Sequence, residues 1–248
     1  MRSRATYGYA LLAAFCSVCG SAAASGLQVS PITLSLLASQ VADGLWLSNA
    51  GHGALYAQVR VYHWTQPNGV EQLTLSRSLL VSPPMLQIQP NDEQLVRVIR
   101  VGPPPIGPQA VEDAYRISID ELPVTGAGVR SGLQFVLHYS LPIFVEPVSV
   151  THLAPVLHWS LESDGEKAFL DVSNSGTEHA QLSGVTYVDA AGRRGDITPG
   201  LLGYVLPGAT MRFALRQPAS DFAGNVTFEA MVNGSNLTQN VSLADTPR

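Results

Sequence analysis

Hydrophobic and polar residues alternate along this chain in short runs rich in β-branched and aromatic side chains, and Gly, Pro, Asn or Asp residues separate the runs. Because successive side chains of a strand point to opposite faces, a period of two predicts half-buried strands. No long segment shows the helical period. The spacing of the runs in the first half predicts a β-sandwich. They cover residues 27–37, 44–48, 55–64, 79–81, 94–101, 115–122 and 133–145.

The same pattern begins again after Glu146-Pro147 and predicts a second β-sandwich. Its strands are expected at residues 156–161, 168–173, 180–189, 201–206, 210–215, 225–232 and 240–243. So short a connection leaves little room for independent motion, and proline fixes its own φ and restricts the residue before it. We therefore expect an all-β protein whose two sandwiches hold one mutual angle and enclose a cleft.

The N-terminal residues have the composition of a secretory signal peptide. Arg2 and Arg4 supply the positive end, residues 9–18 are apolar, and Ala24 belongs to a small-residue cleavage site before Ser25. The apolar run is shorter than the roughly 20 residues that a membrane-spanning helix needs, so we prefer export to a membrane anchor. The predicted division is a signal peptide at residues 1–24, a first domain at 25–146 and a second domain at 147–248.

Cysteine content and charge exclude several classes of function. Both cysteines, Cys16 and Cys19, lie in the predicted signal peptide, so the exported chain has neither disulfides nor thiol chemistry. The net charge is −5 with only 13% charged residues, which argues against a nucleic-acid partner. With 46% hydrophobic residues, some apolar surface remains exposed and available for binding.

One segment stands out because large apolar residues occupy every second position. Leu133, Phe135, Leu137 and Tyr139 share one face of a predicted strand. This face either packs into the core of its own sandwich, or serves as a donated strand whose alternate side chains fill a groove in another protein. The periodicity does not choose between the two.

Several short motifs, taken in their order and spacing, resemble the periplasmic pilus-assembly chaperones of the chaperone/usher pathway, and the end of the first domain is most similar to the archaic or spore-coat-type branch. The similarity covers nearly the whole first domain. The matching pieces are Asn49, Val81-Ser82-Pro83-Pro84, Ile88-Gln89-Pro90, Gln94 with Arg97, Tyr115-Arg116, Asp120-Glu121-Leu122-Pro123 and the segment 133–147.

The resemblance implies two immunoglobulin-like sandwiches and a function in binding rather than catalysis. In that family the last strand of the first domain is lent to a pilus subunit that lacks its own final strand, and the complex is delivered to an outer-membrane usher. The matching residues are Leu133, Phe135 and Leu137, with Tyr139 as a fourth. We thus expect a periplasmic protein with no cofactor and no direct membrane insertion. The alternative is a structural pilus or surface subunit.

The chain departs from the family where a subunit's terminal carboxylate is bound. Many members carry a basic residue in the first strand and another in the last strand of domain one, whereas Thr33 and Pro142 stand at the matching positions here. A desolvated carboxylate still needs a cationic partner. The candidates are Arg97, ranked first, and Arg116. Arg100 is expected on the opposite sheet face from Arg97.

The resemblance also implies a contact between an acidic and a basic residue across the domain junction. Glu121 matches the acidic residue, but Glu146 stands at the basic position. Two acids that approach each other would repel, so we expect either compensation by Arg193 or Arg194, or no contact at all.

The remaining residues favour neither an enzyme nor a metal protein. His63 with His138, or His152 with His158, would have to approach from neighbouring strands, and no tight ligand spacing is present. The sequence has no Gly-x-Ser-x-Gly motif for a nucleophile. Adjacent acids such as Asp120-Glu121 point to opposite strand faces, which is poor geometry for acid/base catalysis.

Overall fold

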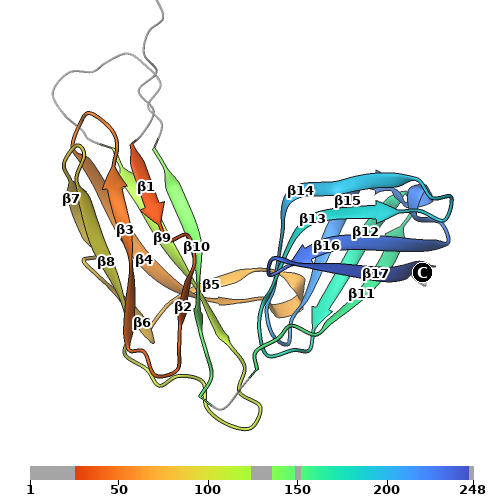
Figure 1. Ribbon diagram of the computed structural model, residues 1–248, viewed down its shortest axis with the longest axis horizontal. Helices are drawn as coiled ribbons and strands as arrows, with labels where there is room; N and C mark the ends of the chain where they lie inside the picture. The colour runs from red at the N-terminus through yellow and green to blue at the C-terminus, as the bar shows by residue number, and fades with distance from the viewer. Residues whose placement is uncertain (1–25, 124–135, 149–151, 246–248) are drawn as a thin grey trace, which may run out of the picture.

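The computed structural model describes residues 26–123, 136–148 and 152–245, and its elements form two β-sandwiches (Figure 1). Strands β1 to β10 build the first sandwich and strands β11 to β17 build the second. The only helical elements among the described residues are two short 3-10 turns, and none of these residues forms a helix long and apolar enough to cross a membrane.

The first sandwich consists of two sheets. Sheet one has the order β1-β3-β8-β6, and sheet two has the order β2-β10-β9-β4-β5, with β7 also paired to β4. The strands span β1 Leu27–Ser30, β2 Leu34–Leu36, β3 Ala42–Asn49, β4 Leu55–Thr65, β5 Gln72–Leu75, β6 Leu79–Ser82, β7 Met85–Ile88, β8 Glu93–Arg100, β9 Asp113–Leu122 and β10 His138–Val145.

The predicted alternation is what closes this sandwich. Leu45 and Leu47 of β3, Val96 and Val98 of β8, and Ile117 of β9 are buried in one core, while the residues between them point outward. Burial of alternate side chains from both sheets thus fixes the register of each strand.

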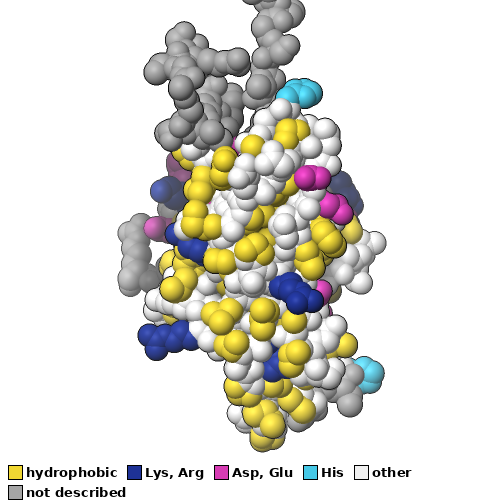
Figure 2. All heavy atoms as spheres, turned by 90° about the vertical axis from the view of Figure 1, so that its left-hand side faces the viewer, with side chains coloured by type: hydrophobic (Ala, Val, Ile, Leu, Met, Phe, Trp, Pro, Cys, Tyr) yellow, Lys and Arg dark blue, Asp and Glu magenta, His cyan; other side chains and the backbone are white. Residues whose placement is uncertain are grey.

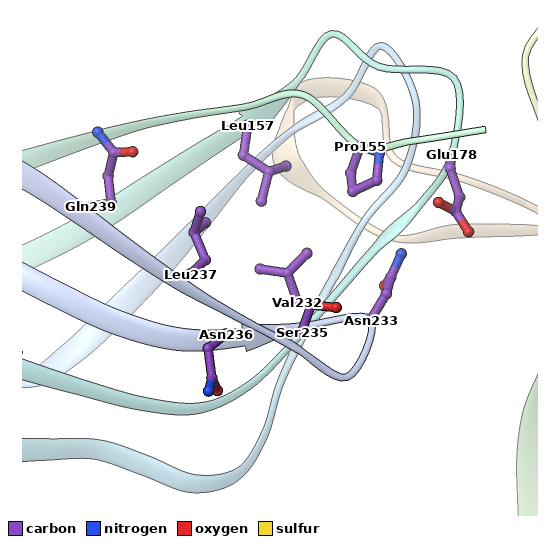
Figure 3. Close-up of a pocket in the computed structure, with 9 residues that line it drawn as sticks. All are labelled: Pro155, Leu157, Glu178, Val232, Asn233, Ser235, Asn236, Leu237 and Gln239. Carbon is purple, nitrogen blue, oxygen red and sulfur yellow. The ribbon is translucent and has the colours of Figure 1, made fainter. Parts of the chain in front are cut away.

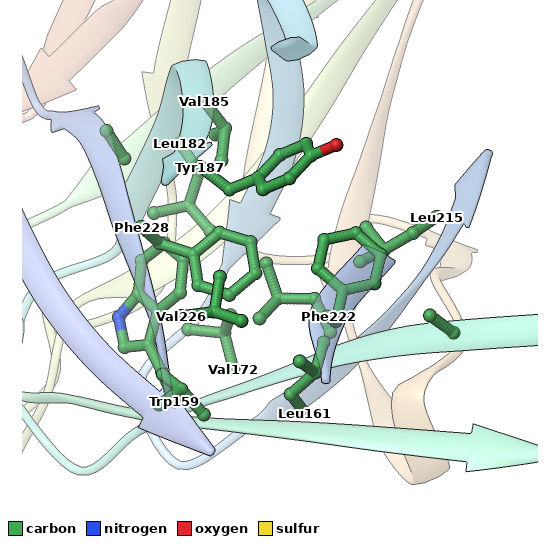
Figure 4. Packing of buried hydrophobic residues seen from close by; sticks show 14 of the residues in the cluster. Trp159, Leu161, Val172, Leu182, Val185, Tyr187, Leu215, Phe222, Val226 and Phe228 are labelled. Carbon is green, nitrogen blue, oxygen red and sulfur yellow. The ribbon is translucent and has the colours of Figure 1, made fainter. Parts of the chain in front are cut away.

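The second sandwich is one continuous path of strands in the order β14-β13-β16-β17-β11-β12-β15. Its core contains Trp159, Phe222 and Phe228, whose rings lie together with aliphatic side chains from both halves of the sheet (Figure 4). The strands span β11 Leu157–Asp164, β12 Lys167–Asn174, β13 Ala180–Val188, β14 Arg194–Val205, β15 Thr210–Pro218, β16 Asn225–Val232 and β17 Ser235–Asp245.

The structure corrects the sequence-based elements in three places. The expected strand 27–37 is two strands, because the chain leaves sheet one after Ser30 and joins sheet two at Leu34. Pro31 and the next residues belong to neither ladder, and proline has no amide to donate to one. Strands β5 and β7 were not expected. Strand β14 begins at Arg194, earlier than the predicted start at 201.

A hairpin of the first sandwich forms much of the domain junction. Strands β4 and β5 extend toward the second sandwich (Figure 1), and Gln66 at their turn is 6% exposed. Its side-chain amide donates to the Tyr204 carbonyl at 2.9 Å, and its Oε1 accepts from the Leu206 amide at 2.8 Å. At the same turn, Gly69 has a φ of +73°, and a Cβ there would lie 3.3 Å from the Thr210 carbonyl oxygen.

Candidate functional site

Strand β10 has one edge that is largely open. Its inner edge pairs with β9 along the full length from His138 to Val145, whereas on the outer edge β2 pairs only with Ile143–Val145. Among the described strands, none pairs with the outer edge of residues 138–142. Unpaired N–H and C=O groups along an edge are a template for an added strand.

The two faces of this strand differ in burial. Leu137, Tyr139 and Leu141 are half-buried and pack against the core of the first sandwich. The Tyr139 hydroxyl donates to the Leu27 carbonyl at 2.8 Å and so connects the two sheets. On the other face, Val136 is 49% exposed.

In the free chain Leu137 and Tyr139 thus line the rim of their own core, as the first alternative supposes. Leu133 and Phe135 lie outside the described residues. The donor role of the four residues stays a prediction.

A row of outward-facing residues crosses sheet two next to the open edge. Pro142 of β10 lies opposite Arg116 of β9, and Arg116 lies opposite Tyr62 of β4. Thr33 directly precedes Leu34, the partner of Ile143, so the same register places Thr33 beside Pro142. Thr33 and Pro142, which stand where many family members have basic residues, therefore lie in one row with Arg116.

Arg116 is held in place by aromatic rings from both sandwiches. Its guanidinium carbon lies 3.8 Å from the ring centroid of Trp64 and 5.2 Å from that of Tyr204. The side chain is 14% exposed, and its ion-pair partner Glu71 is half exposed at 3.7 Å. Burial lowers the pKa of Arg116, while Glu71 and Tyr204 act against this shift. The guanidinium also donates to the Ser140 carbonyl of β10 at 3.4 Å. That Arg116 binds a carboxylate stays a prediction.

The structure does not bring Arg97 to this row. Arg97 lies on β8 of sheet one, opposite Gly44 and Ser82, and its face of that sheet also exposes Trp46 and Leu80. Figure 2 shows the molecule from the side of the first sandwich, where hydrophobic and basic side chains are interspersed.

Arg100 has a structural role, because it donates hydrogen bonds to the backbone carbonyls of Ala38, Gln40 and Gly102. That Arg97 binds a carboxylate remains a prediction.

A polar cluster occupies the same face of sheet two closer to the open edge. Asp120 accepts hydrogen bonds from Arg60 at 2.7 Å and Ser118 at 3.1 Å, and its other oxygen lies 2.5 Å from His138 Nδ1. Burial opposes the charge on Asp120, but the bonds from Arg60 and His138 outweigh it and lower the pKa of Asp120. His63, which pairs with Asp113 at 2.8 Å, lies opposite Tyr115 and is not brought to His138.

Of the two alternatives for Glu121 and Glu146, the structure supports the absence of a contact between them, because they lie at opposite ends of the β9–β10 pair. Glu121 lies at the far end of β9, where its amide donates to the Leu137 carbonyl, whereas Glu146 follows Val145, the partner of Asp113. Because β9 and β10 are antiparallel, the end of one meets the start of the other. Arg193 and Arg194 form their ion pairs with Asp189 and Glu229 within the second sandwich.

The acidic residue at the junction is Glu112, directly before β9, and its basic partner is His179 of the second sandwich. The His179 Nδ1 lies 2.9 Å from Glu112 Oε1, and the His179 amide donates to Oε2 at 3.1 Å. The His179 ring stacks on Phe144 of β10 at 3.6 Å between centroids. Because β9 and β10 are antiparallel, the end of β10 pairs with the start of β9. This order could have indicated that an acid near residue 113, and not Glu121, lies at the domain junction.

Residues 26–151 match the family described as "Pili and flagellar-assembly chaperone, PapD N-terminal domain". The chain belongs to this family. Comparison with curated proteins gives no match. The sequence-based resemblance to the pilus-assembly chaperones is thus confirmed.

Solved structures show the same fold. A chain of the CsuC–CsuE chaperone–tip adhesion subunit pre-assembly complex, from archaic chaperone-usher Csu pili of Acinetobacter baumannii, is 23% identical with a TM-score of 0.68, over 88% of this chain and 99% of that one. The E. coli chaperone DraB is 17% identical with a TM-score of 0.59, over 89% and 97%. A chain of the Salmonella enterica SafA pilin–SafB chaperone complex is 17% identical with a TM-score of 0.61, over 86% and 95%. The predicted pair of immunoglobulin-like sandwiches is confirmed.

Proposed function

We propose that this chain is a periplasmic chaperone that binds pilus subunits by donating a β-strand and delivers them to an outer-membrane usher. The observation that carries the proposal is the open outer edge of β10 in a member of the pilus-chaperone family. An incomplete subunit exposes backbone groups and an apolar groove, and an added strand covers both. The activity is binding alone, without a cofactor or a catalysed reaction.

The donor strand in this proposal continues β10 toward its N-terminus. Leu137 and Tyr139 lie on the face that is half-buried at the rim of the core, and Leu133 and Phe135 follow the same period. At about 25 cal/mol per Å² of apolar surface, a few such side chains in a subunit groove contribute several kcal/mol. That is sufficient to hold a subunit until a neighbouring subunit replaces the strand.

Arg116 is the carboxylate anchor that the geometry of the free chain favours. It lies in the same row as Pro142 and Thr33, one strand in from the open edge, and its guanidinium lies against Trp64. Arg97, on sheet one, is the competing candidate.

The experiment is capture of a pilus subunit in cells that export both proteins. The wild-type chain is expected to co-purify with the subunit and to prevent its degradation. Phe135→Glu should abolish capture while the free chaperone keeps its melting temperature. Val136→Glu is the matched control, because Val136 is exposed on the opposite face. No capture by the wild-type chain would refute the proposal, and unfolding of the Phe135→Glu protein would assign that face to the core.

A further inference from the structure

The domain junction contains a side-chain cluster that subunit capture does not use. Glu112, with 4% of its side chain exposed, is bound through both oxygens to His179 of the other sandwich. Stacking on Phe144, with an angle of 5° between the ring planes, holds the imidazole in one orientation. One ring nitrogen therefore points at a buried carboxylate across the junction.

A second carboxylate completes the cluster. One oxygen of Glu178, one oxygen of Glu112 and one ring nitrogen of His179 all lie within 4.8 Å of one another. Among the described residues, no lysine or arginine forms an ion pair with Glu112 or Glu178. Negative charge thus exceeds what a single imidazole can balance.

Of the three residues, Glu178 also lines a pocket in the second sandwich. The pocket has a volume of about 480 Å³, and the Glu178 carboxylate and Asn233 lie at its end toward the junction (Figure 3). Apolar side chains of Pro155, Leu157 and Leu237 form much of the wall. An ion in this pocket would meet the Glu178 carboxylate.

We propose that Glu112, Glu178 and His179 bind one divalent transition-metal ion of the Zn²⁺ type across the domain junction. Two carboxylate oxygens and an imidazole nitrogen are ligands that Zn²⁺ accepts, and a water molecule fills the fourth position. In the complex His179 offers the lone pair of Nδ1 to the ion and carries its proton on Nε2. The two carboxylates then balance the two charges of the ion. The Glu112 Oε2 keeps its bond from the His179 amide.

The ion would fasten the two sandwiches together, because its ligands come from both. This inference is independent of the proposed function, since it concerns the free chaperone. A failure of the metal test leaves strand donation untouched, and a failure of subunit capture leaves the metal site untouched.

The test is isothermal titration of the untagged purified protein with ZnCl₂, together with thermal melting with and without the ion. We expect one Zn²⁺ per chain and a higher melting temperature. Glu178→Gln should weaken binding at least tenfold, as should His179→Asn, and each should abolish the thermal shift. The matched control is His158→Asn on the exposed face of β11, which should bind like the wild type.

Glu178→Gln keeps the experiment decisive if His179→Asn does not fold, because it leaves the stacked rings of Phe144 and His179 in place. Zinc affinity unchanged in the Glu178→Gln protein would overturn the proposal. So would the absence of saturable binding by the wild type, or a loss of binding in the His158→Asn control.

Discussion

Replacing Arg116 with glutamine tests the carboxylate anchor most directly. The side chain is 14% exposed and its guanidinium is fixed by Trp64 at 3.8 Å, so a bound carboxylate would form a partly desolvated, charge-assisted hydrogen bond. Such bonds contribute about 1.5–3 kcal/mol, which corresponds to a roughly 10- to 150-fold change in Kd. Arg116→Lys should lose less, because it keeps the charge but not the planar fork.

The assay uses a peptide with the sequence of a subunit's last strand, titrated into the chaperone once as the free acid and once as the C-terminal amide. Amidation removes the carboxylate, so Arg116→Gln should weaken binding of the acid and leave binding of the amide nearly unchanged. Arg97→Gln is the matched control and should change neither by more than about twofold. Equal losses for both peptides would refute the anchor role of Arg116. An acid-specific loss in Arg97→Gln would restore Arg97 as the first candidate.

The remaining predictions concern stability and shape. Gln66→Met removes two buried hydrogen bonds across the junction and should lower the free energy of unfolding by about 2–4 kcal/mol in denaturant melts. The control Gln58→Met in β4 should cost less than about 0.5 kcal/mol. The bond to Asp113 raises the pKa of His63, so this pair stabilises the fold at acidic pH and the contribution is lost as the pH rises through that raised pKa. His63→Asn should therefore destabilise the protein more at pH 5 than at pH 9, and an equal cost at both would contradict the pairing. Solution scattering should fit one rigid, bent shape, whereas a broad distribution of interdomain distances would argue against the fixed angle.

The strands that the sequence predicted best have one buried face. Alternation in β3, β4 and β8 follows the core positions closely, since burial imposes the period. Strand β5 was missed because all four of its residues are exposed, so no contrast between faces exists along it. The split at Pro31 was missed because both halves of the segment alternate between buried and exposed residues, and only the sheet that each half joins differs.

The site could be predicted only as far as local periodicity reaches. The period of two shows that Arg97 faces outward from its strand, but it does not show which sheet that strand joins. The position of Arg116 beside Pro142 depends on the pairing of β9 with β10, and the contact between Glu112 and His179 joins residues 67 positions apart in the chain. Such contacts follow from topology, which a single sequence does not specify.

Strand β10 has two roles that are separated by only a few residues. Its first half has the open edge, and Phe144 near its end packs in the junction against Trp64, Tyr204 and His179. A rigid strand transmits displacement along its length, so any change of domain angle on capture makes the two events thermodynamically coupled, and the coupling is reciprocal. A ligand or substitution that favours one domain angle then changes the affinity for the subunit. By the same factor, a bound subunit changes the equilibrium between the domain angles. The strength of capture could thus be adjusted from a position that never touches the subunit.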